Sequence, residues 1–275
     1  MATPIGNLSD LSNRATEVLR SVGACYAEDT RRTGRLLKAI GSTVPLRSLH
    51  AHNEQARTAE AMARLADGMK LALVSDGGTP AVSDPGARLV EAVLETGGRV
   101  SPVPGPSAVS AALSAAGMPG RSFFFAGFSP RKGPSKRRWI NDVRASRHTV
   151  VLFESPWRTG RLLADLAEAG LSDRRAVFCR ELTKLHEEVM RSSVGELAAG
   201  FAESRPRGEV TLVLEGCGEG VSAREVDAAD TDIADRAEQL AGAGFSRRDA
   251  AARLAEEFGL KRNQAYKAAE AGGGV

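Results

Sequence analysis

The sequence lacks the features of several common protein classes. Its three cysteines are scattered, and an odd number fits neither a disulfide framework nor a zinc site. No apolar run approaches the ~18 residues that span a bilayer, and the first ten residues do not resemble a secretory signal. Lys and Arg total 37 against 34 Asp and Glu, so the net charge of +3 gives no global sign of a nucleic-acid partner. We therefore expect a cytoplasmic protein with reduced cysteines, in which any nucleic-acid signal is local.

Common nucleotide-binding and metal-binding patterns are also missing. Neither GxGxxG nor GxxxxGK[ST] occurs, so dinucleotide-binding and P-loop folds lose support. His50 and His52 stand two residues apart, but no third ligand follows at a suitable spacing, so no metal site is expected. Cys25 and Cys179 lie in strand-like runs, where a cysteine is usually a small buried apolar residue.

Apolar runs alternate with amphipathic ones for most of the chain. This alternation predicts an α/β fold with a largely parallel sheet, and 275 residues suffice for about two domains. The expected strands are 22–27, 45–49, 70–75, 99–103, 122–127, 148–154, 175–180 and 209–215, and the expected helices include 54–66, 86–96, 107–116, 158–169 and 194–203.

The amino-acid composition changes near the carboxyl end of the sequence. We expect an N-terminal α/β lobe at 1–105, a second α/β lobe at 106–216, a Gly, Glu and Asp rich linker at 217–230, and a helical segment at 231–275. In that last segment, Ser246 is suited to cap a helix that Gly259 ends, and a second helix follows. This helix-turn-helix outline fits nucleic-acid contact and equally a hairpin that packs on a neighbour.

Three turns rich in glycine and proline are the strongest local signal. SDGGTPAVSDPG (75–86) follows an apolar run, PVPGPSAVSAALSAAG (102–117) enters a helix of small residues, and TPIGN (3–7) opens the chain. A strand, a glycine turn and a helix together present backbone N–H groups to a ligand. Two such turns on neighbouring strands predict a ligand cleft at the sheet edge.

Charged residues cluster in four further places. The segment 129–139 holds five cations beside Trp139, which suits the backbone of a nucleic acid or simply a solvated helix face. After the first predicted strand, Asp29 is a helix cap or part of a polar cluster with Arg31 and Arg32. FESPWR (153–158) and RELTKLHEE (180–188) each follow a strand, where a general base or ordinary ion pairs are expected.

Taken in order, TPIGNLSD, AEDTRRT, LVSDGGTPAVSDPG, PVPGPSA, FESPWR, RELTKLHEE and PRGEVTLVLEG resemble the tetrapyrrole methylase superfamily, and within it the branch that methylates small-subunit ribosomal RNA. The resemblance covers about residues 2–216, and the helical tail is similar as well. It implies 2′-O-methylation of a cytidine in 16S ribosomal RNA, with S-adenosylmethionine as methyl donor held between two α/β lobes, and a homodimer.

The resemblance assigns the residues that contact the methyl donor, and charge and position suggest the candidates for the other roles. It places the methyl donor against Pro4, Gly78, Thr79, Val82, Ser107, Ala108 and Phe153. It transfers no acid–base pair, so the candidates for substrate positioning or proton removal are Glu28, Asp29, Lys184, His186 and Glu187. The candidate RNA-binding residues are Arg31, Arg32, Arg131, Lys132, Lys136, Arg137, Arg138 and Arg158.

Two departures and two alternatives accompany this interpretation. The family normally has a complete apolar strand before TPIGN, whereas Met1 and Ala2 alone stand there, so either that strand is missing or the natural start lies upstream. Gly77 replaces a common Ala, with little expected consequence. A methyltransferase acting on a porphyrin-type or corrin-type ring would need an apolar trough and no basic segment. A non-enzymatic nucleic-acid-binding protein would have no use for three glycine turns.

Overall fold

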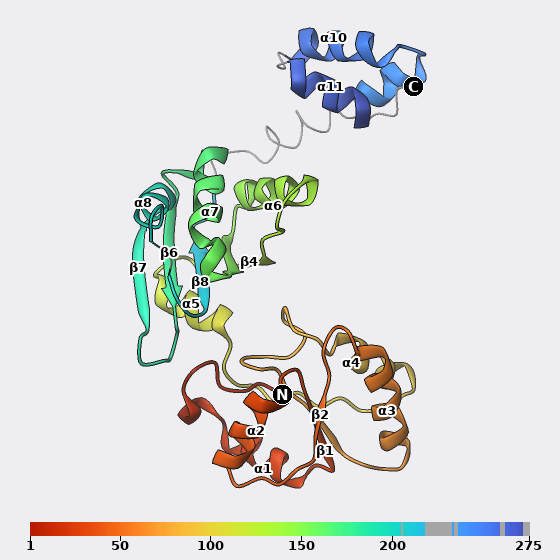
Figure 1. The fold of residues 1–275 in the computed structure, drawn as a ribbon, viewed down its shortest axis with the longest axis vertical. Helices are drawn as coiled ribbons and strands as arrows, with labels where there is room; N and C mark the ends of the chain where they lie inside the picture. The colour runs from red at the N-terminus through yellow and green to blue at the C-terminus, as the bar shows by residue number, and fades with distance from the viewer. Residues whose placement is uncertain (205, 218–232, 234–235, 259–261, 272–275) are drawn as a thin grey trace. The chain divides into compact units, whose positions relative to one another are not determined.

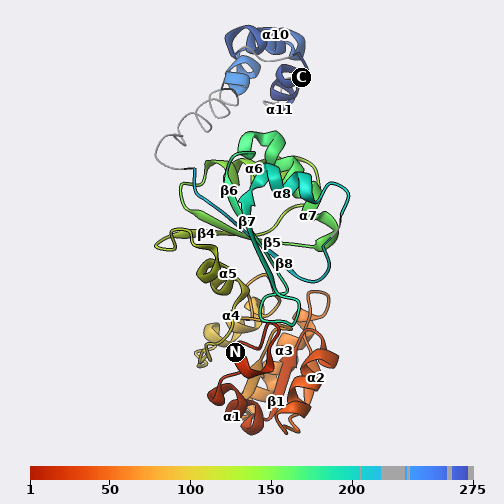
Figure 2. The same ribbon diagram turned by 90° about the vertical axis from the view of Figure 1, so that its left-hand side faces the viewer.

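A computed structural model describes residues 1–204, 206–217, 233, 236–258 and 262–271. The chain divides into two compact units, residues 1–139 with 148–215 and residues 140–147 with 216–275. Most of the predicted linker at 217–230 and Gly259 lie outside the described residues. The first unit holds both sheets, and Figures 1 and 2 show them with their helices.

The first sheet is a parallel, three-stranded sheet in the order β2-β1-β3. Helices lie on both of its faces because side chains of a strand alternate between faces. Cys25 and Ala27 of the central strand pack in one cluster with Leu19 and Leu37, whereas its Ala24 and Tyr26 pack in another with helices later in the chain. The elements are η1 (Leu8–Asp10), α1 (Asn13–Ser21), β1 (Ala24–Ala27), α2 (Thr30–Ala39), β2 (Leu46–Ser48), α3 (Glu54–Ala66), β3 (Leu71–Leu73) and α4 (Ala87–Glu95).

The predicted strand at 99–103 is wrong. This segment is irregular, and Val103 uses its carbonyl to accept a hydrogen bond from the Ala2 amide at 3.0 Å. Pro102, Pro104 and the following Pro106 have no N–H group, so the segment cannot complete a ladder. As a result β3 is an edge strand, and the Met1 ammonium donates to the Leu73 carbonyl at 2.8 Å.

The second sheet has five strands in the order β4-β5-β8-β6-β7. β4 and β5 are parallel, but β8 runs antiparallel to β5 and β6, and β7 is antiparallel to β6. The expectation of a largely parallel sheet is therefore wrong for this half. Its elements are α5 (Ala108–Ala116), β4 (Phe123–Phe128), α6 (Pro134–Ala145), β5 (Thr149–Glu154), α7 (Pro156–Leu166), the π-helical turn η2 (Ala167–Leu171), β6 (Arg175–Arg180), β7 (Glu188–Ser193), α8 (Val194–Gly200) and β8 (Val210–Leu214).

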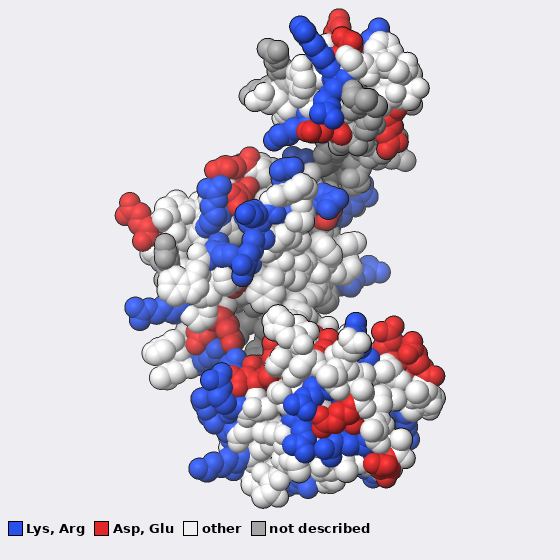
Figure 3. Space-filling view, turned by 45° about the vertical axis from the view of Figure 1, so that its right-hand side comes forward, with Lys and Arg blue, Asp and Glu red and all other residues white. Residues whose placement is uncertain are grey.

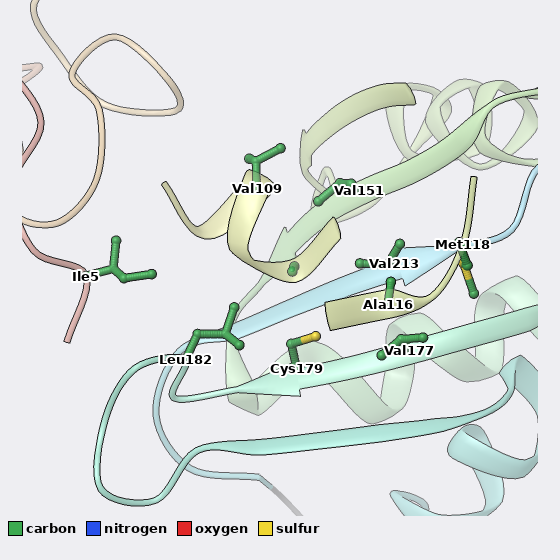
Figure 4. Packing of buried hydrophobic residues seen from close by; sticks show 10 residues of the cluster. Ile5, Val109, Ala116, Met118, Val151, Val177, Cys179, Leu182 and Val213 are labelled. Carbon is green, nitrogen blue, oxygen red and sulfur yellow. The ribbon is translucent and has the colours of Figure 1, made fainter. Parts of the chain in front are cut away.

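Helix α5 covers one face of this sheet. Figure 4 shows Val109 and Ala116 of α5 near Val151, Val177 and Val213, which rise from three adjacent strands, and all belong to one buried cluster. On the opposite face, Phe178 packs against Phe201, which directly follows α8. The centroids of their two rings are 4.7 Å apart. Cys179 shares the α5 cluster, and burial raises the pKa of its thiol to about 11; the pKa of the buried Cys25 thiol rises to about 12 for the same reason. Both cysteines are thus the inert buried residues that the sequence predicts.

The second unit contains α10 (Arg247–Phe258) and α11 (Arg262–Ala271), which pack around a small core with Leu240 and Leu254. Ser246 accepts a hydrogen bond from the Asp249 amide at 3.3 Å, so the predicted cap is confirmed. Nucleic-acid contact by this helix pair stays a prediction. In the part of the chain that the structure describes, no helix combines the length and the apolar character needed to cross a membrane.

Candidate functional site

A cavity of about 360 Å³ lies where the turn after β3, the start of α5 and the ends of β4, β5 and β8 meet. Its volume is in the range of small-molecule sites, ~300–1,000 Å³. The two glycine turns that the sequence singled out both contribute to its wall. Among the residues predicted to contact the methyl donor, those that line it are Gly78, Thr79, Val82, Ser107, Ala108 and Phe153. Pro4 is not in the lining, and its carbonyl lies against Gly77, 3.4 Å from where a Cβ would be.

A larger cavity of about 500 Å³ lies along the open edge of β3. Leu71, Leu73, Val93 and Val103 form much of its mostly apolar wall, and Arg99 is the charged side chain in it. Because chemistry needs convergent polar groups as well as volume, the smaller cavity is the functional candidate.

The turn at Gly78 is held by the start of the chain. Thr3 and Gly78 exchange backbone hydrogen bonds of 2.9 Å, and the Ser75 hydroxyl donates to the Gly78 carbonyl at 2.8 Å. Gly78 has φ +93, a conformation that side chains disfavour. Since Thr3 already takes its amide hydrogen, Gly78 contributes shape and space to the cavity rather than a hydrogen bond.

The start of α5 supplies backbone N–H groups to the cavity. Ser107 is the N-cap in extended conformation and its side chain makes no capping hydrogen bond. The first-turn N–H groups of α5, beginning at Ala108, therefore keep their capacity for an anionic group of a ligand.

Aromatic rings form one apolar side of the cavity. The ring centroid of Phe153 lies 5.6 Å from that of Phe128, another lining residue, and 4.9 Å from that of Phe125 behind it. Val82 adds a partly exposed aliphatic side chain. This wall is suited to the flat face of a heteroaromatic ring.

The polar lining of the cavity is strongly acidic. Glu28, Asp76, Asp84, Glu154 and Glu209 all contribute to it, with Arg32 as the cationic side chain in the lining. Burial raises the pKa of the Asp84 carboxyl to about 6, helped by repulsion from three of these neighbours. Burial also raises the pKa of Glu28, with a further contribution from Asp76. An excess of carboxylates favours a ligand that carries positive charge.

Glu154 is the fully buried member of this set. Its carboxylate accepts hydrogen bonds from the Ser155 amide and the Arg158 Nε, both at 2.7 Å, and from the Ser129 hydroxyl. A buried charge is tolerated when its oxygens are satisfied in this way. Glu154 therefore fixes Arg158 at the edge of the site.

Of the five predicted acid–base candidates, Glu28 lines the cavity and the other four do not. Asp29 caps α2 through the Arg31 amide at 2.8 Å, and its hydrogen bond to the Arg31 guanidinium holds its pKa well below the usual range. Lys184 pairs with Glu181 at 2.7 Å and with Glu209 at 3.1 Å.

The last two candidates lie in the loop between β6 and β7. His186 is exposed there, and Glu187 accepts a hydrogen bond from the Thr183 amide at 2.6 Å. Neither residue lines the cavity. A base among the five candidates thus remains a prediction, with Glu28 the one in the cavity wall.

The predicted RNA-binding cations are mostly on the outside. Arg131, Lys132, Arg137 and Arg138 are exposed, whereas Lys136 turns inward to pair with Asp165 of α7. Figure 3 shows Lys and Arg side chains gathered on the face of the second-sheet region that it presents. Elsewhere in the set, Arg31 pairs with Asp29, Arg32 lies 3.4 Å from Glu209, and Arg158 pairs with Glu154.

Trp139 is not an exposed stacking residue. Its indole N–H donates to the Ala126 carbonyl at 2.8 Å and so ties α6 to β4. The exposed aromatic side chains near the cavity include Phe128 of its lining, which is 51% exposed, and Trp157, which follows the lining residue Pro156 and is 72% exposed.

Sequence reasoning missed several acidic residues of the cavity. Asp76 and Asp84 lie inside the glycine turn at 75–86, but the sequence prediction for that turn used its glycines and not its acidic residues. Their spacing within one turn that leaves a strand was the available signal. Glu209 precedes β8, and no pattern in the sequence indicates that it reaches the same cavity.

Comparison with known proteins decides the family. The model of the tetrapyrrole (corrin/porphyrin) methylases matches residues 2–198. The chain belongs to the tetrapyrrole methylase family. A protein of Escherichia coli O157:H7 named ribosomal RNA small subunit methyltransferase I is 43% identical over 267 residues, which cover 96% of this chain and 91% of that protein. A protein of the same name from Synechocystis is 39% identical over 267 residues, 97% of this chain and 95% of its own length.

Solved structures agree on the fold. A cobalt precorrin-4 methyltransferase superposes with a TM-score of 0.60 at 17% identity, covering 78% of this chain and 92% of its own. A diphthine synthase gives a TM-score of 0.60 at 18% identity, covering 77% and 87%. At such identities the likeness establishes the two-sheet fold alone.

Proposed function

We propose that this protein transfers a methyl group from S-adenosylmethionine to the 2′-hydroxyl of a cytidine in small-subunit ribosomal RNA. Relatives about 40% identical over nearly the whole chain carry the name of a small-subunit ribosomal RNA methyltransferase. The observation that carries the proposal is the division of charge, with carboxylates inside the cavity and exposed cations on the segment 131–138.

The residues of the cavity fit the methyl donor. When bound, S-adenosylmethionine supplies a methyl group on a positively charged sulfur, which is a good leaving group. The acidic lining suits that charge. The free amides at the start of α5 suit a carboxylate, and the Phe153 wall suits an adenine ring. A side chain at Gly78 would take up space that such a ligand needs.

The chain's own residues contribute mainly by orientation. Methyl transfer needs the attacking oxygen in line with the carbon–sulfur bond, and fixing that alignment supplies several kcal/mol of rate acceleration. The turn at Gly78 is fixed by Thr3 and Ser75, and the part of the wall at the end of β5 is fixed by buried Glu154. Both walls are thus set before any ligand arrives.

The basic segment suits the substrate proposed here. RNA is a polyanion, and exposed Lys and Arg side chains bind its phosphates with an affinity that falls as salt rises. A porphyrin-type ring gives no reason for four exposed cations on 131–138. A nucleic-acid-binding protein without activity gives no reason for an acidic cavity of this size.

The test is direct methylation of ribosomal particles. Purified protein is incubated with methyl-labelled S-adenosylmethionine and small ribosomal subunits from cells that lack this modification, and the digested RNA is analysed by mass spectrometry. We expect 2′-O-methylcytidine in small-subunit RNA and none in large subunits. Label on the base, or label transferred only to a porphyrin-type ring supplied in parallel, would contradict the proposal.

We further propose that the protein acts in the cytoplasm, where its RNA substrate is found, and as a homodimer. β4 is an edge strand of the second sheet, and its Phe123 and Phe124 are 45% and 38% exposed. Exposed aromatics on an edge strand are suited to contact with another chain. Sedimentation equilibrium should give twice the chain mass, and Phe124→Lys should shift it toward the monomer. A monomeric wild-type protein would contradict the dimer.

A further inference from the structure

The site described so far lacks a defined acceptor for the proton of the attacking hydroxyl. Asp29, Lys184 and Glu187 are each engaged with partners, and His186 lies outside the cavity lining. Glu28 is in the lining, where it is one of the acidic neighbours of Asp84. Asp84, which the sequence did not single out for chemistry, belongs to the cavity wall.

Asp84 differs from the paired carboxylates in its contacts. It is half-buried and, among the described residues, makes no hydrogen bond or ion pair. It lies on the same turn as the lining residues Gly78, Thr79 and Val82, so it faces the ligand space from the side that the donor is proposed to contact. Its oxygens therefore remain available to a substrate.

The negative charges around Asp84 come from its own turn and from two other segments. Glu28 follows β1, Asp76 follows β3, and Glu209 precedes β8. Arg32 of α2 is the nearby cation, but it is shared between Asp76, at 4.0 Å, and Glu209, at 3.4 Å. Burial and these carboxylates make Asp84 a stronger base than an ordinary aspartate, while leaving most of it ionised at pH 7.

We propose that Asp84 is a catalytic residue of this site, whose carboxylate accepts the proton of the substrate hydroxyl during methyl transfer. As the hydroxyl oxygen bonds to the methyl carbon, Asp84 takes the hydroxyl proton, the carbon–sulfur bond breaks, and the sulfur keeps that electron pair. Asp84 is partly exposed and returns the proton to water afterwards. The inference rests on the proposed function, because it needs a hydroxyl as the methyl acceptor.

The experiment compares Asp84→Asn with the wild type in single-turnover methylation of small subunits between pH 5 and 8.5. The wild-type rate should rise with pH through a midpoint near 6 and then level off. Asp84→Asn should be slower by about 10²–10⁴-fold at pH 7.5 and should lack that midpoint. Glu28→Gln, which removes one of the neighbouring negative charges, should move the midpoint to lower pH. Asp67→Asn, at an exposed carboxylate beyond the end of α3, is the matched control and should behave as wild type.

Two measurements without catalysis complete the test. Carboxyl-carbon NMR of aspartate-labelled protein should show one aspartate titrating near pH 6, absent in Asp84→Asn. Calorimetry with S-adenosylhomocysteine should give the variant an affinity within about threefold of wild type, which also shows that it folds.

Three outcomes would overturn the assignment of Asp84. They are a variant rate within threefold of wild type, a midpoint near 6 that persists in the variant, and loss of S-adenosylhomocysteine binding. A failure of the proposed function looks different, because the wild-type protein would then leave small subunits unmethylated while the titration near pH 6 is present. In that case no hydroxyl is deprotonated and the role of Asp84 falls as well.

Discussion

The cavity and the segment 131–138 lie in the same chain and differ in almost every physical respect. The cavity is partly buried, fixed by backbone hydrogen bonds and lined by carboxylates. The segment is exposed, and its cations Arg131, Lys132, Arg137 and Arg138 have no ion pair among the described residues. A small cationic donor and a large polyanion need opposite surroundings, and the chain provides each in a separate place. If this division is correct, substitutions in the cavity should weaken donor binding alone, and substitutions in the segment should weaken RNA binding alone.

The largest effect is expected from filling the cavity. Gly78→Val places a branched side chain at φ +93 beside Ile5, 3.6 Å from its Cγ2, and takes ligand space. S-adenosylhomocysteine affinity should fall more than about tenfold, a cost above 1.4 kcal/mol, while affinity for small-subunit RNA stays the same. Calorimetry and filter binding measure the two.

The matched control for this change is Gly68→Val. Gly68 has a similar φ of +79 and open space around it, and it is not part of the cavity lining. It carries the same backbone strain, so it should lose stability but keep donor affinity. Equal loss of donor affinity in both variants would show that strain, and not the cavity, is responsible.

Substitutions in the basic segment 131–138 are expected to weaken RNA binding and to leave donor binding unchanged. Arg137→Gln with Arg138→Gln should weaken RNA binding about tenfold and lower the slope of log affinity against log salt by about two, one for each lost phosphate contact. Donor affinity should not change. Arg88→Gln with Arg121→Gln removes the same charge from other exposed positions. A parallel fall in donor and RNA affinity would remove the assignment of this segment.

A smaller effect concerns the stability cost of the acidic cavity. The pKa of Asp84 is raised to about 6 in the folded state against about 3.8 unfolded, so ionised Asp84 destabilises the fold above pH 6. Asp84→Asn should therefore be more stable than wild type by about 1 kcal/mol at pH 8. The difference should shrink as pH falls through 6 toward 4, as measured by urea unfolding. A variant that is less stable at pH 8 would contradict this.

The smallest effect is expected at Glu209, which is the charged link between the two sheets. Its carboxylate meets Arg32 and Lys184, but its side chain is 60% exposed. Such pairs contribute about 0.2–1 kcal/mol, so Glu209→Gln should weaken donor binding by about fivefold or less. The effect should vanish in 1 M salt, since screening removes interactions between exposed charges. An effect that persists at high salt would indicate a direct contact with the ligand.

Part of the fold and of the cavity could be predicted from the sequence alone. The helix at 54–66 and the glycine turns at 75–86 and 102–117 follow from local patterns that need no knowledge of distant contacts, whereas the lining residues Gly78, Thr79 and Ser107 were assigned by the family resemblance. Asn53 stands at the N-cap position of α3, but its side chain accepts a hydrogen bond from the His50 amide and does not cap the helix.

Other features depend on contacts between distant segments. β7 was missed because EVMRSS has weak apolar alternation and is a strand through its pairing with β6. The strand at 99–103 failed because prolines outweighed its apolar residues. The meeting of Glu28 and Glu209 with Asp84 in one cavity could not be predicted, since these residues come from three separate segments and meet only in the folded chain.

A crystal structure of the protein with S-adenosylhomocysteine would show directly whether the acidic cavity holds the methyl donor. We expect ligand density bounded by Gly78, Asp84, Ser107 and Phe153, with the carboxylate of the ligand at the start of α5. Ligand density in the apolar cavity beside β3, with the acidic cavity empty, would contradict it.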